Sequence, residues 1–223
     1  NHPTTKFNTE ASMNIADDPE LMDMLVRSGF NKVFIGIETP DEESLTACSK
    51  IQNTKRDLIE DVKKIQRAGL QVQGGFIVGF DSDTESIFQR QIDFIQKSGI
   101  VTAIVGLLQA PFGTRLYDRM QEEGRIIGDT TGDNVDGSMN IVPKMDAGKL
   151  NKGYHEILNK IYSPRPYYQR VKTFLREYDP VSFKAKLSWQ DIWAFVKSLF
   201  RLGIIGKERF QYWKLLVWTA VHR

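Results

Sequence analysis

Three segments of the chain end in nearly the same way, and this repetition limits the folds open to it. They are Arg27-Ser28-Gly29-Phe30, Arg67-Ala68-Gly69-Leu70 and Lys97-Ser98-Gly99-Ile100. Each places a cation in the last turn of a helix, a glycine just past the helix and an apolar residue leading into a strand. A βα unit that recurs every ~30–40 residues predicts parallel strands joined by right-handed crossovers.

Alternating stretches and apolar runs supply the strands of this repeat. From Lys6 to Met13 apolar and polar residues alternate, which predicts a strand with one polar face. Apolar runs at 33–37, 74–80 and 102–108 lack this alternation. They predict strands of a parallel sheet that is covered on both faces. We expect a partial (βα) TIM-type barrel of parallel strands, in preference to an open doubly wound sheet, followed by an α-helical C-terminal domain.

Helix signals lie between and after the strands. Asp18-Pro19 is an N-cap followed by a first-turn proline, and Asn53-Thr54 and Asp83 are also expected to be N-caps. A long polar loop at 128–140 separates two regions, which we take as domains 1–127 and 128–223. In the second region we expect helices over 148–162 and over Tyr167–Tyr178, after a break at Pro164 and Pro166, and then two amphipathic helices from Ser188 hinged at Gly203 and Gly206.

Composition and charge exclude some classes of site. The single cysteine, Cys48, rules out an internal disulfide and a multi-cysteine metal site within the chain. His2, His155 and His222 are scattered without metal-ligand spacing, so we assign no metal ligand and no catalytic residue. The net charge of +2 divides into −6 over residues 1–164 and +8 over residues 165–223, so a basic tail follows an acidic body.

Motifs in both halves of the chain resemble one enzyme family. In the first half they are Phe34-Ile35-Gly36-Ile37-Glu38-Thr39, the segment from Gly75 to Thr84, and Val105-Gly106-Leu107-Leu108 followed by Pro111-Phe112-Gly113-Thr114. In the second half they are the segments 132–137, 140–145 and 161–164. Together they resemble the radical S-adenosylmethionine family, in the subgroup with an N-terminal cobalamin-binding domain that includes hopanoid C-2 methylases.

The resemblance implies a set of cofactor contacts at the ends of the strands. The chain begins at what would be the third strand of the family's barrel, so Glu38 matches the end of the fourth strand, which contacts the ribose or the amino acid part of S-adenosylmethionine. The fifth-strand motif, which flanks the adenine, implies cofactor contacts from Gly75, Ile77 and Gly79. The resemblance implies a further cofactor contact from Leu108, in the sixth strand. The family also uses a 4Fe-4S cluster and cobalamin, whose cysteine ligands and binding domain would lie outside this chain.

Several of these residues have a plainer interpretation. On the sequence alone, Glu38 fits equally well as an acidic residue in the first turn of a helix and as a cofactor ligand. The resemblance favours the cofactor ligand. Asn8, Glu10 and Ser12 share the polar face of the first strand, which would line the barrel lumen and contact substrate or would simply be solvated. The rings and cations of the tail fit contact with a membrane surface, and equally fit a helical hairpin packed on the barrel.

The resemblance predicts methyl transfer to an unactivated carbon of an apolar or lipid-like substrate, carried out by a longer protein. The alternative is a catalytically inactive, membrane-associated scaffold or binding fragment. The expected partners are the missing N-terminal part of the barrel, the cobalamin domain, an apolar small molecule and the membrane surface, with no nucleic acid. We expect a cytoplasmic location, peripheral to the inner face of the membrane, and no activity from this chain alone because the cluster cysteines are absent.

Overall fold

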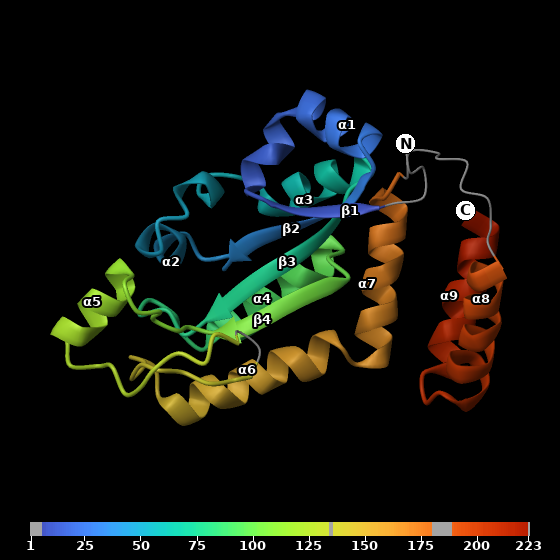
Figure 1. Ribbon diagram of the computed structural model, residues 1–223. Coiled ribbons are helices and arrows are strands. Elements are labelled where there is room, and N and C mark those ends of the chain that lie inside the picture. The colour runs from blue at the N-terminus through green and yellow to red at the C-terminus, as the bar shows by residue number, and fades with distance from the viewer. Residues whose placement is uncertain (1–5, 134–135, 180–188, 223) are drawn as a thin grey trace.

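A parallel sheet of four strands forms the centre of the first half of the chain (Figure 1). The structure is a computed structural model that describes residues 6–133, 136–179 and 189–222. The strands are β1 (Phe7–Ala11), β2 (Phe30–Glu38), β3 (Gln71–Val78) and β4 (Thr102–Leu107), and they pair in the order of the chain. The parallel βα arrangement is confirmed, and closure into a barrel stays a prediction because the described strands form an open sheet.

Helices follow each strand and then continue to the end of the chain. Their bounds are α1 (Pro19–Arg27), α2 (Glu42–Ala47), α3 (Leu58–Arg67), α4 (Ser86–Ser98), α5 (Arg115–Glu122), α6 (Ala147–Ile161), α7 (Pro164–Glu177), α8 (Trp189–Phe200) and α9 (Arg209–His222). Short turns of 3₁₀-helix lie at Met13–Asp17 and Ile51–Asn53, and a π-helical turn at Arg201–Ile205 joins α8 to α9. No helix in the described part of the chain has the length and apolarity that crossing a membrane requires.

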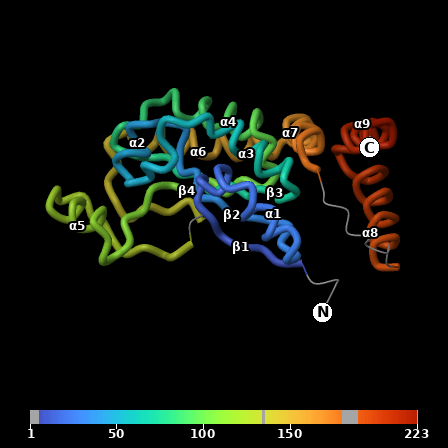
Figure 2. The backbone as a smooth tube through the Cα atoms, turned by 90° about the horizontal axis from the view of Figure 1, so that it is seen from above, coloured from blue at the N-terminus to red at the C-terminus, as the bar shows by residue number. Residues whose placement is uncertain are grey.

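The two faces of the sheet differ in what covers them. Helices α3, α4 and α6 lie on one face (Figure 2), where side chains such as Ile35, Val72 and Val105 are fully or almost fully buried. On the other face Phe34 and Ile77 are only partly buried and Ile104 is exposed. The apolar runs predicted strands that are covered on both faces. This prediction is wrong for the face with Phe34, Ile77 and Ile104, which is open in the described structure.

The repeated helix ends form as expected. Gly29, Gly69 and Gly99 have φ values of 97°, 95° and 74°, a region that disfavours residues with a side chain. At Gly99 an added Cβ would also lie 2.9 Å from the backbone nitrogen of Phe174, so α7 approaches the chain closely there. The sequence signal therefore marks both a turn and a packing contact.

Two expected helix starts are wrong. Asp57, not Asn53, caps α3 by accepting a hydrogen bond from the backbone N–H of Glu60, because the chain first makes a 3₁₀ turn. Helix α7 starts at Pro164, since a proline fits the first helical position, whose N–H has no partner in the helix. The break between α6 and α7 is thus shorter than expected.

Helix α6 packs closely on α4, and Gly153 makes this contact possible. A Cβ added at Gly153 would lie 2.3 Å from the ring of Phe88, a buried residue of α4. The expected division into domains 1–127 and 128–223 is not tested by this contact and stays a prediction. The contact between Gly153 and Phe88 does show that α6 completes the core of the first half of the chain.

Replacing Gly153 with alanine is expected to destabilise the protein by about 1–3 kcal/mol, because the added methyl group would overlap the buried ring of Phe88. Urea unfolding of the Gly153→Ala variant measures this. The matched control is Asn151→Ala at an exposed position of the same helix, which should be neutral or slightly stabilising. Equal stability of Gly153→Ala and wild type would contradict the described packing.

Candidate functional site

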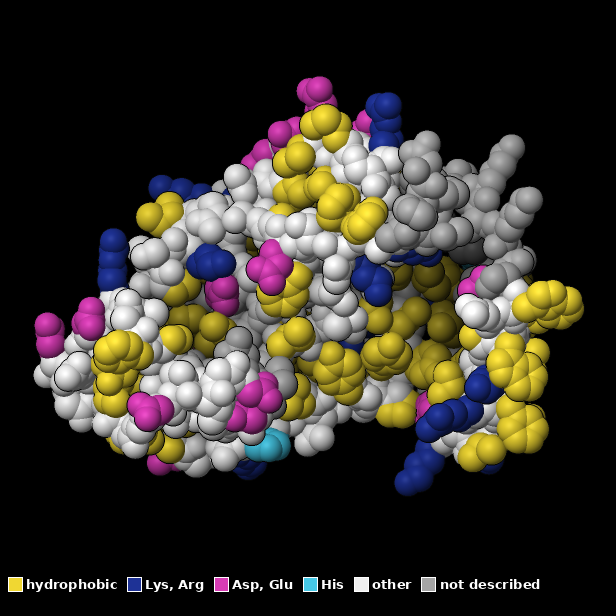
Figure 3. Space-filling view, viewed as in Figure 1, with side chains coloured by type: hydrophobic (Ala, Val, Ile, Leu, Met, Phe, Trp, Pro, Cys, Tyr) yellow, Lys and Arg dark blue, Asp and Glu magenta, His cyan; other side chains and the backbone are white. Residues whose placement is uncertain are grey.

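A pocket of about 780 Å³ opens at the carboxyl ends of β2, β3 and β4, between α2 and α5. Its position is the one where parallel α/β sheets bind ligands, and its volume is in the range of small-molecule sites. The hollow is visible in Figure 3, with hydrophobic side chains inside it. Four of the five expected cofactor residues line the pocket: Glu38, Gly75, Ile77 and Leu108.

Glu38 is held in a strained backbone conformation at the end of β2. Its φ is 67°, which is unfavourable for a residue with a side chain, and the pairing of β2 with β3 shifts register between Gly36 and Glu38. Its side chain is only 16% exposed and its carboxylate lies 3.0 Å from the ammonium group of Lys50. Residues held in such conformations cluster at functional sites, which supports the expected role of Glu38.

Glycine at position 36 leaves room for this carboxylate. A Cβ added to Gly36 would lie 2.5 Å from Oε1 of Glu38 and 3.0 Å from Nζ of Lys50. The ion pair is therefore folded back over the backbone of its own strand. A ligand that replaces Lys50 as the partner of Glu38 would find the carboxylate already in place.

Two buried amide side chains hold the irregular end of β2. Asn53 donates hydrogen bonds to the carbonyl oxygens of Gly36 and Ile37 at 3.2 and 3.3 Å. Gln91 of α4 donates to the carbonyls of Ile77 at 2.7 Å and Glu38 at 3.3 Å. Both amides replace strand hydrogen bonds that the distorted backbone does not make, so they position the site without contacting a ligand.

Gly79, the fifth expected cofactor residue, lies outside the pocket lining. Its φ is 105° and its N–H donates to Asp83 at 2.8 Å. A Cβ at this position would lie 3.0 Å from a methyl group of Leu150 in α6. The structure thus gives Gly79 a part in the turn after β3 and in the packing of α6.

Asp83 closes that turn and does not cap α4, contrary to the expectation. Its carboxylate accepts from the N–H groups of Gly79 and Phe80, whereas α4 begins at Ser86 after Glu85, which makes no side-chain cap. Burial raises the pKa of the Asp83 carboxyl to about 6, although the two N–H groups and the Ser44 hydroxyl act in the opposite direction. The charged form is therefore costly in the folded protein.

This cost predicts a pH dependence of stability. Because the folded pKa is raised, the contribution of Asp83 is favourable below its ordinary value of 3.8 and is lost as the pH rises through about 6. Asp83→Asn keeps an oxygen acceptor for the turn but cannot ionise, so it should gain about 3 kcal/mol over wild type above that window and nothing below it. Urea unfolding of both proteins across the window tests this, and a pH-independent difference would contradict it.

A cluster of cations surrounds Asp81 at the other end of the pocket. Arg125 binds its two carboxylate oxygens at 2.7 and 3.0 Å, and Arg119 and Lys144 lie 3.2 and 3.6 Å away. The hydrogen bonds from Arg125 hold the pKa of the Asp81 carboxyl below its usual value. The positive charges exceed the negative charges at this end of the pocket. At the other end lies the carboxylate of Glu38, which is paired with Lys50.

The expected lumen residues lie away from this pocket. Asn8 and Glu10 are exposed on β1, the edge strand, and their partners in the sheet are Lys32 and Phe34 on the open face. Ser12 is exposed just after the strand, at the start of a 3₁₀ turn. The structure brings Asn8 and Glu10 onto the same face as the pocket, and their contact with substrate stays a prediction.

The chain offers no set of metal ligands in its described part. No group of three His, Cys, Asp or Glu side chains in these residues could hold a metal ion. Cys48 lines the pocket, and burial raises the pKa of its thiol, so it is not poised as a thiolate ligand. Ligands for an iron–sulfur cluster would have to come from outside this sequence, which has a single cysteine.

Comparison with known proteins identifies relatives along almost the whole chain. A family model described as a domain of unknown function, DUF4070, matches residues 114–223. An uncharacterized methyltransferase of Synechocystis is 37% identical over 93% of this chain and 40% of its own length. The hopanoid C-2 methylase of Rhodopseudomonas palustris is 29% identical over 92% of this chain and 40% of its own length.

A further relative acts on a pigment. The bacteriochlorophyllide d C-12(1)-methyltransferase of Chlorobaculum tepidum is 31% identical over 54% of this chain and 26% of its own length. The relatives of this chain are thus methyltransferases, among them a hopanoid C-2 methylase. This confirms the resemblance stated from the motifs. The chain spans about two fifths of the length of the first two relatives and corresponds to a C-terminal part of them.

Proposed function

We propose that this chain is the C-terminal portion of a cobalamin-dependent radical S-adenosylmethionine methyltransferase that acts on an unactivated carbon of an apolar, lipid-like or pigment-like substrate. The observation that carries the proposal is the position of Glu38. Glu38 has a strained backbone conformation and lies in a pocket at the carboxyl ends of parallel strands. The resemblance predicts that this residue binds the cofactor, and the relatives of the chain are methyltransferases.

The residues of the pocket fit S-adenosylmethionine. The cofactor has hydroxyl and ammonium donors, a carboxylate and a flat aromatic base. Glu38 can accept hydrogen bonds from such donors, and the cations near Asp81 attract a carboxylate. Gly106 adds no side chain to the pocket lining, and the Phe34 ring, which lies over Gly75, offers an aromatic surface for a flat base. Bound next to Glu38 and the apolar residues of the pocket, S-adenosylmethionine would supply the radical chemistry that the resemblance implies, and cobalamin would supply the methyl group.

The residues do not fit the cluster or the cobalamin in the same way, because the described chain has no set of metal ligands. The role proposed for this chain is therefore binding and shielding. Phe34, Ile77 and Ile104 form an apolar wall beside the pocket that would exclude water from the reacting carbon. Glu38 and Lys50 would orient the cofactor against that wall.

The test uses the complete protein that contains this chain. It is purified without oxygen, supplied with a low-potential reductant and S-adenosylmethionine labelled in its methyl group, and mixed with lipid and pigment extracts. The proposal expects label in an apolar product whose mass has increased by one methylene. A complete protein that binds the cofactor but transfers no methyl group to any extract would favour the inactive scaffold.

A further inference from the structure

The last two helices form a hairpin held by its own contacts. The hydroxyl groups of Ser198 in α8 and Tyr212 in α9 are 2.8 Å apart, and the indole N–H of Trp213 donates to the carbonyl of Gly203 at 2.9 Å. A Cβ added to Gly203 would lie 3.3 Å from the ring of Trp213, so the indole packs closely on this glycine. The π-helical turn between the helices is thus part of the hairpin's packing.

The hairpin rests on the rest of the molecule through one side of α9. The ring of Trp218 has Lys172 and Arg176 of α7 above it, with the cationic groups 5.8 and 5.5 Å from the ring centroid. Helix α9 lies beside α7, and α8 extends from another side of α9 (Figure 2). The hairpin therefore leaves most of its surface without a partner among the described residues.

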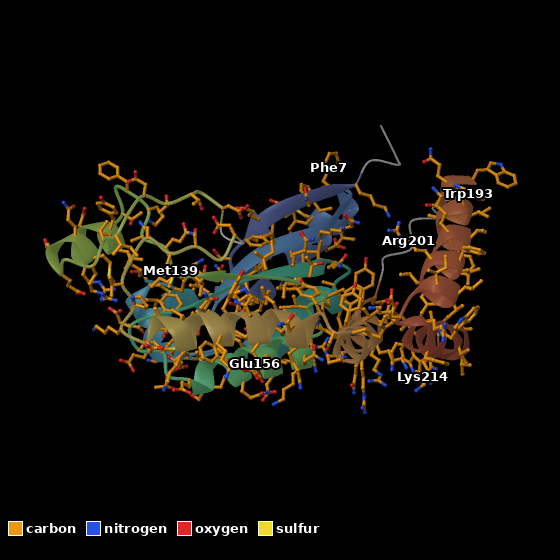
Figure 4. The ribbon with its side chains drawn as sticks, turned by 90° about the horizontal axis from the view of Figure 1, so that it is seen from below. Phe7, Met139, Glu156, Trp193, Arg201 and Lys214 are labelled. Carbon is orange, nitrogen blue, oxygen red and sulfur yellow. The ribbon has the colours of Figure 1, made fainter. Side chains whose placement is uncertain are left out.

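That surface is apolar and aromatic. None of the described side chains in α8 or α9 is buried, and Trp189, Trp193 and Phe210 are 85%, 60% and 68% exposed. Figure 3 shows hydrophobic side chains along the outer edge of the hairpin, and Trp193 points away from the molecule in Figure 4. More than half of the exposed large apolar side chains in the described part of the chain are in this hairpin. Exposed patches of this kind mark interaction sites.

The hairpin also carries cations, and two of them, Lys197 and Arg209, lie beside the exposed rings of Trp193 and Phe210. Residues 189–222 contain Lys197, Arg201, Lys207, Arg209 and Lys214 against two acids. The ammonium group of Lys197 lies 5.7 Å from the Trp193 ring centroid. Aromatic rings with Lys and Arg beside them are the composition of helices that lie in the interface of an anionic membrane. A second copy of the hairpin would bring cations against cations, so the charge favours an anionic surface.

We propose that the α8–α9 hairpin docks the protein on anionic lipid, with Trp189, Trp193 and Phe210 in the interface and the cations at the headgroups. The docking does not depend on the proposed enzymatic function. The helices lie on the membrane and do not cross it. All four tryptophans of the sequence are in the hairpin, so the intrinsic fluorescence of the full chain reports on this segment alone.

The experiment titrates the full chain with vesicles of phosphatidylcholine and phosphatidylglycerol, and with vesicles of phosphatidylcholine alone. A blue shift of the tryptophan emission, quenching by brominated acyl chains and weakening by salt are expected with the anionic vesicles only. Lys197→Glu together with Arg209→Glu removes the two cations beside Trp193 and Phe210, keeps every tryptophan and should weaken binding by roughly hundredfold. The matched control, Lys152→Glu with Lys160→Glu on α6, makes the same charge change at exposed positions and should bind as wild type.

Three results would overturn the proposal. The first is the absence of a blue shift with anionic vesicles. The second is equal binding by the hairpin variant and the α6 control, because attraction would then come from overall charge. The third is a blue shift that depends on protein concentration without vesicles, which would identify the surface as a contact between copies of the chain.

Discussion

Replacing Arg170 with methionine is expected to destabilise the protein by about 3–4 kcal/mol, the largest stability loss we expect from a single residue. Arg170 of α7 is completely buried, yet no described carboxylate pairs with it. Its guanidinium donates to the Gln96 side chain and to the carbonyls of Ile161 and Val101 at 2.7, 2.7 and 3.2 Å.

The reason for the large effect is that three acceptors lose their donor at once. Methionine has a similar shape but no N–H group, so these oxygens would stay buried without partners. The guanidinium also lies 5.5 Å from the ring centroids of Tyr162 and Tyr167. These rings stabilise its positive charge, a role that a carboxylate counter-ion would otherwise have. Together these contacts attach α7 to α4 and to the segment before β4.

Urea unfolding of Arg170→Met measures the loss, and Arg165→Met is its control. Arg165 is exposed on the same helix, so its replacement should change stability by less than about 0.5 kcal/mol. If Arg170→Met were as stable as wild type, the buried guanidinium would not hold α7 as described.

Replacing Glu38 with glycine is expected to raise stability and abolish activity. Glycine adopts the φ of 67° at little cost, so the folded protein should gain about 1 kcal/mol once the strain is removed. Methyl transfer by the complete protein should fall by roughly hundredfold or more, because this change removes the carboxylate that we propose orients the cofactor. Opposite changes in stability and activity are typical of a strained functional residue.

Lys55 offers a matched control for this prediction. It has a φ of 55° but lies outside the pocket lining. Lys55→Gly should therefore give a similar gain in stability with unchanged methyl transfer. If Glu38→Gly retained full activity, or if Lys55→Gly lost as much, the assignment of Glu38 to the cofactor would be wrong.

The local features of this fold could be read from the sequence, because they depend on residues close together in the chain. The C-terminal glycines of the helices, such as Gly29, and the N-cap Asp18 act within one turn, and both are confirmed. The order of strands and helices follows from these signals. The open face of the sheet could not be predicted, since an apolar run does not tell which segments will cover it.

The supports of the site were missed because they join distant parts of the chain. Asn53 has the pattern of a helix cap, but its side chain reaches back to β2, which lies 16 or 17 residues earlier. Arg125 and Asp81, 44 residues apart, form an ion pair that no local pattern indicates. Gln91 did leave a signal, as a polar residue within the apolar stripe of α4 between Phe88 and Ile95.

We propose that the pocket around Glu38 binds S-adenosylmethionine, and equilibrium dialysis of the labelled cofactor against the complete protein measures this binding. Binding is expected for the wild type and for Lys55→Gly. We expect binding weaker by roughly tenfold or more for Glu38→Gln, which keeps the shape of the side chain but removes the charge that accepts the cofactor's donors. Equal affinities of the wild type and Glu38→Gln would contradict this proposal.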